Sequence, residues 1–189
     1  MKKFNVLIVL FFCCVYCFAQ ERWDSGNASY TNHTYSFHWN LPNQFVWKKS
    51  LANEKHTVFK ALSDYGLIVF VNINSYEAST TVPDMWENFE KYKKLYEYSW
   101  RKTKERIGGN TEPIKIEKCR FAGANAIKLI VRQSLKDDVI DETSYGITYN
   151  FHKDNAMWSV SLKCSEEVYK SVGEQGLKVI FRGFGMNAK

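Results

Sequence analysis

Short turns join four segments in the second half of the chain in pairs, and the two segments of the second pair alternate between apolar and polar residues. Residues 114–121 and 125–133 flank Ala122-Gly123-Ala124, and residues 143–151 and 157–163 flank a turn with four polar residues, 152–155. Alternation with a period of two is typical of strands that bury one face. Strands connected by such short turns must run antiparallel. The sequence therefore predicts two β-hairpins in an antiparallel sheet.

A helix is predicted on either side of these hairpins. The first runs from about Pro83 to the Gly108-Gly109 pair, with acidic residues near its start and basic residues near its end. The second begins after Ser165 and ends near Phe181. The apolar face of the first helix has a three- and four-residue spacing that is typical of an amphipathic helix; it consists of Met85, Phe89, Tyr92, Tyr96 and Trp100.

Shorter strands are predicted upstream, at residues 34–39, 45–47, 56–62 and 67–73. The last of these is rich in β-branched residues and is expected to be a central strand. Two amphipathic helices must bury their apolar faces against a sheet. The predicted fold class is therefore α+β, a single antiparallel β-sheet with amphipathic helices packed on it.

The first 19 residues have the parts of a cleavable signal peptide. Lys2 and Lys3 precede thirteen uncharged residues, 6–18, and small residues, Cys17 and Ala19, stand where a signal peptidase requires them. Thirteen apolar residues are fewer than the roughly 20 that a spanning helix needs. We therefore expect no permanent membrane span and an exported chain, periplasmic or secreted after cleavage. An uncleaved N-terminal anchor is the alternative.

The mature chain is expected to start with a flexible, polar lead-in at residues 20–32, followed by a single α+β domain at residues 33–189. The full sequence has 26 basic and 20 acidic residues. Loss of Lys2 and Lys3 lowers the net charge from +6 to +4. Basic and acidic residues alternate along the mature chain, so no positive face for nucleic acid is predicted.

Three of the five cysteines belong to the predicted signal peptide, which leaves Cys119 and Cys164. An exported chain meets oxidising conditions, so these two are a possible disulfide. Two separate buried thiols are the alternative. Neither cysteine lies in a CxxC motif or beside a histidine, and no metal site is predicted.

No catalytic residue or cofactor is predicted from the sequence. The four histidines are scattered, and Cys164 has no neighbouring histidine that could act as its base. The acidic run from Asp137 to Glu142 lacks the spacing of an EF-hand. Motifs of the G-x-S-x-G, P-loop and GxGxxG types are absent from the sequence. A non-enzymatic protein is expected, with a hydrolase whose residues meet only in three dimensions as an alternative.

Two tryptophans stand beside basic pairs and are predicted to form a binding surface. Trp47 precedes Lys48, and Trp100 precedes Arg101. A tryptophan that keeps one face exposed often contributes binding energy. An envelope protein, a glycan or a membrane surface would suit such positions, although the rings could also simply cap the core. A small apolar ligand or lipid held under residues 85–100 is a further alternative.

Several local patterns, which together cover most of the mature chain, are those of a known fold; they are Tyr35-Ser36-Phe37 with Leu41-Pro42 and Phe45-Val46-Trp47, the strand 67–73, the helix start at Pro83-Asp84, the turn at 119–126 and the ending 158–184. These patterns resemble the PsbP-like fold shared by photosystem II extrinsic subunits and periplasmic DcrB-like proteins. The resemblance implies a PsbP-like α/β sandwich and a binding or assembly role without catalysis. The sequence-based hypothesis is therefore an exported binding or assembly module of the cell envelope, whose partner and oligomeric state are unknown.

Overall fold

The computed structural model describes residues 21–52, 55–77, 82, 84–107, 110–136 and 141–187. The predicted signal peptide lies outside these ranges. The chain divides into two compact units. One combines residues 1–46 with residues 178–189, and the other comprises residues 47–177.

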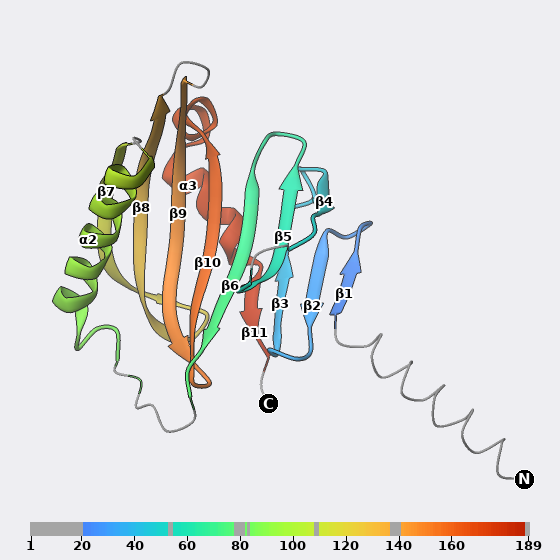
Figure 1. Cartoon of the computed structure of the whole chain (residues 1–189). Helices are drawn as coiled ribbons and strands as arrows, with labels where there is room; N and C mark the ends of the chain where they lie inside the picture. Colours follow the sequence, from blue (N-terminus) through green and yellow to red (C-terminus); the bar gives the residue numbers. More distant parts are fainter. Residues whose placement is uncertain are drawn as a thin grey trace, which may run out of the picture. The chain divides into compact units, whose positions relative to one another are not determined.

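The first unit contains a four-stranded antiparallel sheet in the order β1-β2-β3-β11 (Figure 1). Its strands are β1 (Glu21–Asp24), β2 (Ser29–Asn32), β3 (Phe37–Asn40) and β11 (Phe184–Met186). Trp39 is fully buried, and its indole N–H donates to the carbonyl of Ile180 at 2.8 Å. The ring of Phe184 meets that of Trp39 edge-on at 5.5 Å. Aromatic packing therefore joins the two ends of the chain within this unit.

The second unit contains a seven-stranded antiparallel sheet in the order β4-β5-β6-β10-β9-β8-β7. Two helices accompany these strands, and the last residues of the second helix belong to the first unit. The elements are β4 (Trp47–Lys49), β5 (Thr57–Ser63), β6 (Ile68–Ser75), α2 (Phe89–Ile107), β7 (Asn110–Phe121), β8 (Ala124–Lys136), β9 (Asp141–Lys153), β10 (Ala156–Ser165) and α3 (Glu166–Arg182).

Both predicted hairpins are confirmed, as β7–β8 and β9–β10. Ala122 and Gly123 both have positive φ angles, 48° and 81°, and so do Asp154 and Asn155, 50° and 55°. Two positive φ angles in a two-residue turn match the right-handed twist of the flanking strands. The predicted strand at residues 67–73 is also confirmed, as β6, which lies between β5 and β10.

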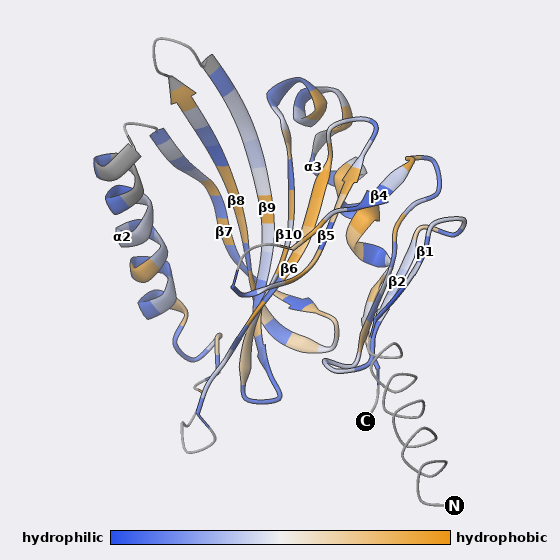
Figure 2. Cartoon of the chain, turned by 45° about the vertical axis from the view of Figure 1, so that its right-hand side comes forward, coloured by the Kyte–Doolittle hydropathy of each residue, from blue (hydrophilic) through white to orange (hydrophobic). Residues whose placement is uncertain are grey.

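The two helices lie on opposite faces of the seven-stranded sheet. Successive residues of β8 point to opposite faces. Ile127 and Leu129 pack with Met85 under the rings of α2, whereas Lys128 pairs with Glu174 of α3. Figure 1 shows α2 in front of β7 and β8 and α3 behind the sheet. In Figure 2 hydrophobic colour follows the strands, while α2 is mostly hydrophilic.

The prediction of a single sheet with helices packed on it is wrong. The described residues form two antiparallel sheets, of four and seven strands, with two helices, and most of the regular structure is strand. The second sheet exists because β3 pairs with β2 and β11. In addition, β1 and β2 occupy the segment that was expected to be a flexible lead-in. Asp24 orders their connection, since its Oδ1 accepts the N–H groups of Gly26 and Asn27.

The two helices also differ from expectation in detail. α2 begins at Phe89, because a turn occupies residues 85–88. α3 is bent at Gly173, whose φ and ψ of 71° and 169° are not helical. Neither helix in the described part of the chain is long and apolar enough to cross a membrane.

Candidate functional site

The residues predicted to bind a partner do not form one site. Trp47 and Lys48 belong to β4, at one edge of the seven-stranded sheet. Trp100 and Arg101 belong to α2, which contacts β7 at the other edge. The Trp47 side chain is only 4% exposed, so its ring fills the core and offers no surface to a partner. Trp100 is half-buried, and Arg101 is exposed.

The inner face of α2 is filled by its own rings. Phe89, Tyr92, Tyr96 and Trp100 pack on the cluster around Ile127. The rings of Tyr96 and Trp100 stack with centroids 6.2 Å apart. Burial raises the pKa of the Tyr96 hydroxyl, which has no hydrogen-bond partner. The space under α2 that an apolar ligand would need is therefore occupied by side chains.

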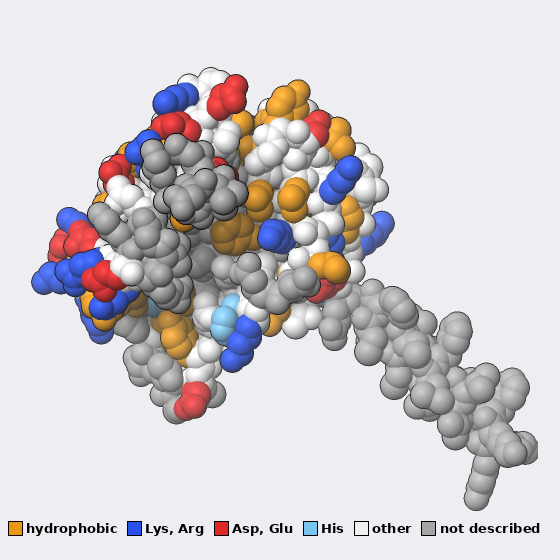
Figure 3. Space-filling view, turned by 45° about the horizontal axis from the view of Figure 1, so that its top comes forward, with side chains coloured by type: hydrophobic (Ala, Val, Ile, Leu, Met, Phe, Trp, Pro, Cys, Tyr) orange, Lys and Arg blue, Asp and Glu red, His pale blue; other side chains and the backbone are white. Residues whose placement is uncertain are grey.

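The exposed face of α2 combines cations with apolar groups. We call this surface the outer face of α2; it consists of Lys91, Lys94, Leu95, Tyr98, Arg101, Lys102 and Glu105, all exposed. Leu95 and Tyr98 are 51% and 52% exposed. The Arg101 guanidinium lies 5.5 Å from the Tyr98 ring centroid. In Figure 3 basic, acidic and hydrophobic side chains mix along the left of the molecule, where α2 lies.

An open cavity of about 290 Å³ lies where the start of α2 meets the hairpin turns. The turn before α2 contributes Asp84 and Met85, the β7–β8 hairpin contributes Asn125, and the β9–β10 hairpin contributes residues 152–155. Sequence reasoning missed this site, since its side chains come from three separate segments. The only local signals were the two turns and the helix start.

Asp84 ties the start of α2 to the β7–β8 hairpin. Its Oδ2 accepts the Asn125 amide at 2.8 Å, and its Oδ1 accepts the N–H groups of Trp86 and Glu87 at 2.7 and 3.2 Å. These hydrogen bonds, with the positive charge of Arg120, hold the pKa of Asp84 below its ordinary value. The carboxylate is thus ionised and surrounded by donors, which suits a structural anchor better than a general base.

Asn155 and His152, which also line the cavity, are engaged within the chain as well. The Asn155 amide donates to the carbonyls of Tyr76 and Glu77 at 3.1 and 2.9 Å. His152 Nε2 and the Tyr76 hydroxyl share a hydrogen bond of 3.3 Å, and the Tyr92 ring meets the imidazole edge-on. These contacts fasten β6 and α2 to the β9–β10 hairpin.

Cys119 and Cys164 are not bonded to each other, so the possible disulfide is not formed. Cys119 lies on β7 and Cys164 on β10, with β8 and β9 between them. Three spacings between strands amount to about 14 Å, whereas disulfide-bonded Cα atoms lie within about 7 Å. Burial raises the pKa of Cys164 to about 11, so its thiol stays protonated near neutral pH.

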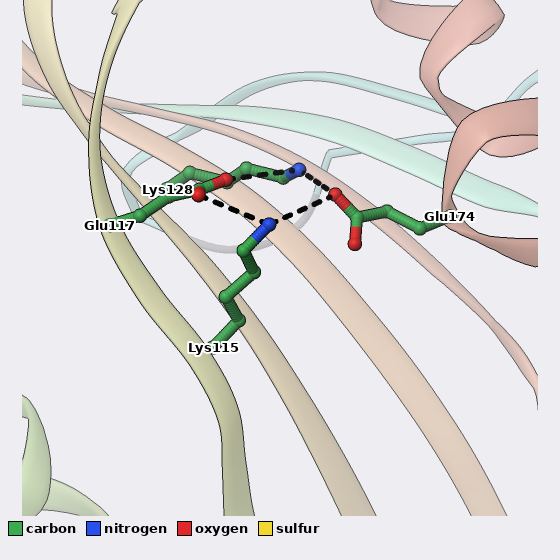
Figure 4. A network of polar contacts seen from close by, with 4 residues as sticks. All are labelled: Lys115, Glu117, Lys128 and Glu174. Atoms are coloured by element: carbon green, nitrogen blue, oxygen red, sulfur yellow. Dashed lines mark hydrogen bonds and ion pairs between the residues drawn. The ribbon is translucent and has the colours of Figure 1, made fainter.

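Groups of three or more His, Cys, Asp or Glu side chains that could hold a metal ion are absent from the described residues. The most buried charge belongs instead to an ion network on the α3 face of the sheet (Figure 4). Lys128, with its side chain 5% exposed, pairs with Glu174 and lies 3.5 Å from Glu117. Lys115 lies 3.0 Å from Glu117 and 3.7 Å from Glu174. The network attaches α3 to β7 and β8.

Comparison with known proteins agrees with a PsbP-like fold. The solution structure of cyanobacterial PsbP (CyanoP) from Synechocystis sp. PCC 6803 matches with a TM-score of 0.56 and 12% identity, over 84% of this chain and 91% of that one. LpqN of Mycobacterium tuberculosis, described as involved in cell envelope biogenesis, matches with a TM-score of 0.49 and 9% identity, over 80% and 83% of the two chains. No family model and no curated protein matches.

Proposed function

We propose that this chain is an exported, non-enzymatic binding module that attaches to a component of the cell envelope through the outer face of α2. The observation that carries the proposal is that exposed Leu95 and Tyr98 share this face with cations. An exposed aromatic ring beside basic side chains is typical of a recognition surface. Export is proposed on the pattern of residues 1–19.

The hydrolase alternative has less support. Two titratable side chains of the cavity, Asp84 and His152, form hydrogen bonds within the chain, and these bonds hold separate segments together. Cys164, the buried thiol, has a raised pKa, which opposes a role as nucleophile. The lipid-carrier alternative has less support because the rings of Tyr96 and Trp100 lie where the ligand would be held.

Sedimentation with envelope membranes tests the proposal. We expect the mature chain, residues 20–189, to sediment with an envelope fraction of the source cell and Arg101→Glu to weaken this binding. Lys48→Glu is the matched control, because it makes the same charge change on β4, at the other edge of the sheet. A mature chain that stays in the supernatant would contradict the proposed function. Equal binding by the Arg101 variant and the wild type would contradict the proposed surface.

A further inference from the structure

We infer that the envelope component that binds the outer face of α2 is an anionic phospholipid surface. The inference rests on the proposed function and names its partner. It follows from three properties of this face, namely its geometry, its charge and its exposed apolar groups.

The first property is geometric: α2 lies flat on the sheet, with one face turned outward along its length. Residues 91, 94, 95, 98, 101, 102 and 105 follow the three- and four-residue spacing of one helix face. From Lys91 to Glu105 the face is about 21 Å long, at 1.5 Å per residue. The opposite side of the helix, with Phe89, Tyr96 and Trp100, packs on the sheet. The outer face is therefore held parallel to the sheet and turned away from it, so its whole length can meet one plane.

The charge of the face is complementary to an anionic surface. It has four cations, Lys91, Lys94, Arg101 and Lys102, against one carboxylate, Glu105, which pairs with Lys102 at 2.7 Å. The remaining exposed acidic residues of α2, Glu90 and Glu97, lie on one flank, about 80–100° around the helix from Tyr98. Each Lys or Arg near an anionic membrane strengthens binding about fivefold.

The apolar groups distinguish a membrane from other anionic partners. Leu95 and Tyr98, each about half exposed, lie between the cations. A leucine among lysines gains little from a sugar or a carboxylate, but it can enter the boundary between headgroups and acyl chains. Tyrosine is enriched at this boundary, since its ring is apolar and its hydroxyl is polar. Cations around a shallow apolar centre are the pattern of a helix that lies in a membrane interface.

Vesicle sedimentation tests the inference with the purified mature chain. We expect binding to vesicles of equal parts phosphatidylglycerol and phosphatidylcholine, much weaker binding to pure phosphatidylcholine, and loss of binding in high salt. Lys94→Glu with Arg101→Glu should weaken binding at least about 25-fold, because two attractions become repulsions. Leu95→Ser with Tyr98→Ser should weaken it at unchanged charge. Lys48→Glu with Lys49→Glu, the matched charge reversal on β4, should bind as the wild type does.

The outcomes separate this inference from the proposed function. If the chain sediments with the envelope fraction but not with anionic vesicles, its partner is an envelope protein or glycan; the inference is then overturned while the proposed function stands. Equal binding to neutral and anionic vesicles, or full binding by the Lys94 and Arg101 double variant, would also overturn it. All four residues changed on the outer face are exposed, and a circular dichroism melt at the wild-type temperature confirms that each variant is folded.

Discussion

Replacing Glu174 by glutamine should destabilise the protein more than replacing Lys128 by methionine, although both changes break the same ion pair. Lys128 is almost completely buried, at 5% side-chain exposure, whereas Glu174 is 25% exposed. A buried ammonium that loses its partner keeps the full cost of its removal from water, and a partly exposed carboxylate does not. The two partners of this pair are therefore not equivalent.

The structure sets the size of each effect. Loss of one partner from a buried pair costs about 3–5 kcal/mol. In Glu174→Gln the Lys128 ammonium still has Glu117 at 3.5 Å and the Tyr149 ring at 5.9 Å. We therefore expect a loss just below this range, about 2–3 kcal/mol. In Lys128→Met the buried charge disappears, and a flexible apolar chain replaces the lysine stem. Lys115 still neutralises Glu117 and Glu174 at 3.0 and 3.7 Å, so the loss should be under about 1 kcal/mol.

Urea unfolding followed by tryptophan fluorescence measures both losses and their coupling. In the Lys128→Met background, Glu174→Gln should cost less than about 1 kcal/mol, because no buried cation remains to be stranded. The single and double variants then give a coupling energy of about 1–3 kcal/mol. If Lys128→Met proves as costly as Glu174→Gln, or if the two losses simply add, the reasoning from burial is refuted.

Three further predictions concern a bend, a carboxylate and the thiols. Gly173→Ala should lower the free energy of unfolding by about 1–3 kcal/mol, since φ and ψ of 71° and 169° suit glycine alone. Gly176→Ala is the control, because only the Val172 side chain must move there; in the same urea titration it should change the free energy of unfolding by less than about 1 kcal/mol. Asp84→Asn should destabilise the protein at pH 7, because the pKa of Asp84 is lower in the folded protein than its ordinary value. In thermal melts at acid pH, the difference in melting temperature from the wild type should vanish as the pH falls through that lower pKa. A difference that stays constant with pH would contradict the lowered pKa of Asp84. Cys119 should react with an alkylating reagent before buried Cys164 does, and a reductant should leave the melting temperature unchanged; a shift on reduction would indicate a disulfide.

The hairpins and the start of α3 could be predicted from the sequence because their determinants are local. The β9–β10 strands alternate, and Gly123 accepts the positive φ of the turn between β7 and β8. The last helix was predicted to begin after Ser165, and the Ser165 Oγ accepts the N–H of Val168 at 3.3 Å, as a helix cap does. Each of these features depends on residues of one hairpin or one helix start, which are neighbours along the chain. Local pattern and tertiary structure agree here, so the prediction holds.

The second sheet could not be predicted because it is decided by contacts that are distant in sequence. Phe184 of β11 pairs with Trp39 of β3, across almost the whole chain. β1 and β2 are polar and four residues long, so they carry too little alternation to be recognised as strands. Their ladder forms because β3 offers a hydrogen-bonding edge, to which β2 pairs with Tyr30 opposite Trp39. These residues form strands because a neighbouring strand pairs with them, and not because of their own β propensity.

The candidate site shows the same division between local and distant determinants. That Trp47 is buried depends on which face of β4 meets the core, and a three-residue strand beside a turn does not reveal this in sequence. The outer face of α2, in contrast, follows from the spacing that identified its inner face. Once Phe89, Tyr96 and Trp100 are assigned to the sheet, 3.6 residues per turn place Leu95 and Tyr98 on the opposite side. These two exposed residues depart from the pattern of an amphipathic helix, because they are apolar, lie on its polar side and are not part of the core. The proposed binding of this face to a membrane surface would account for this departure.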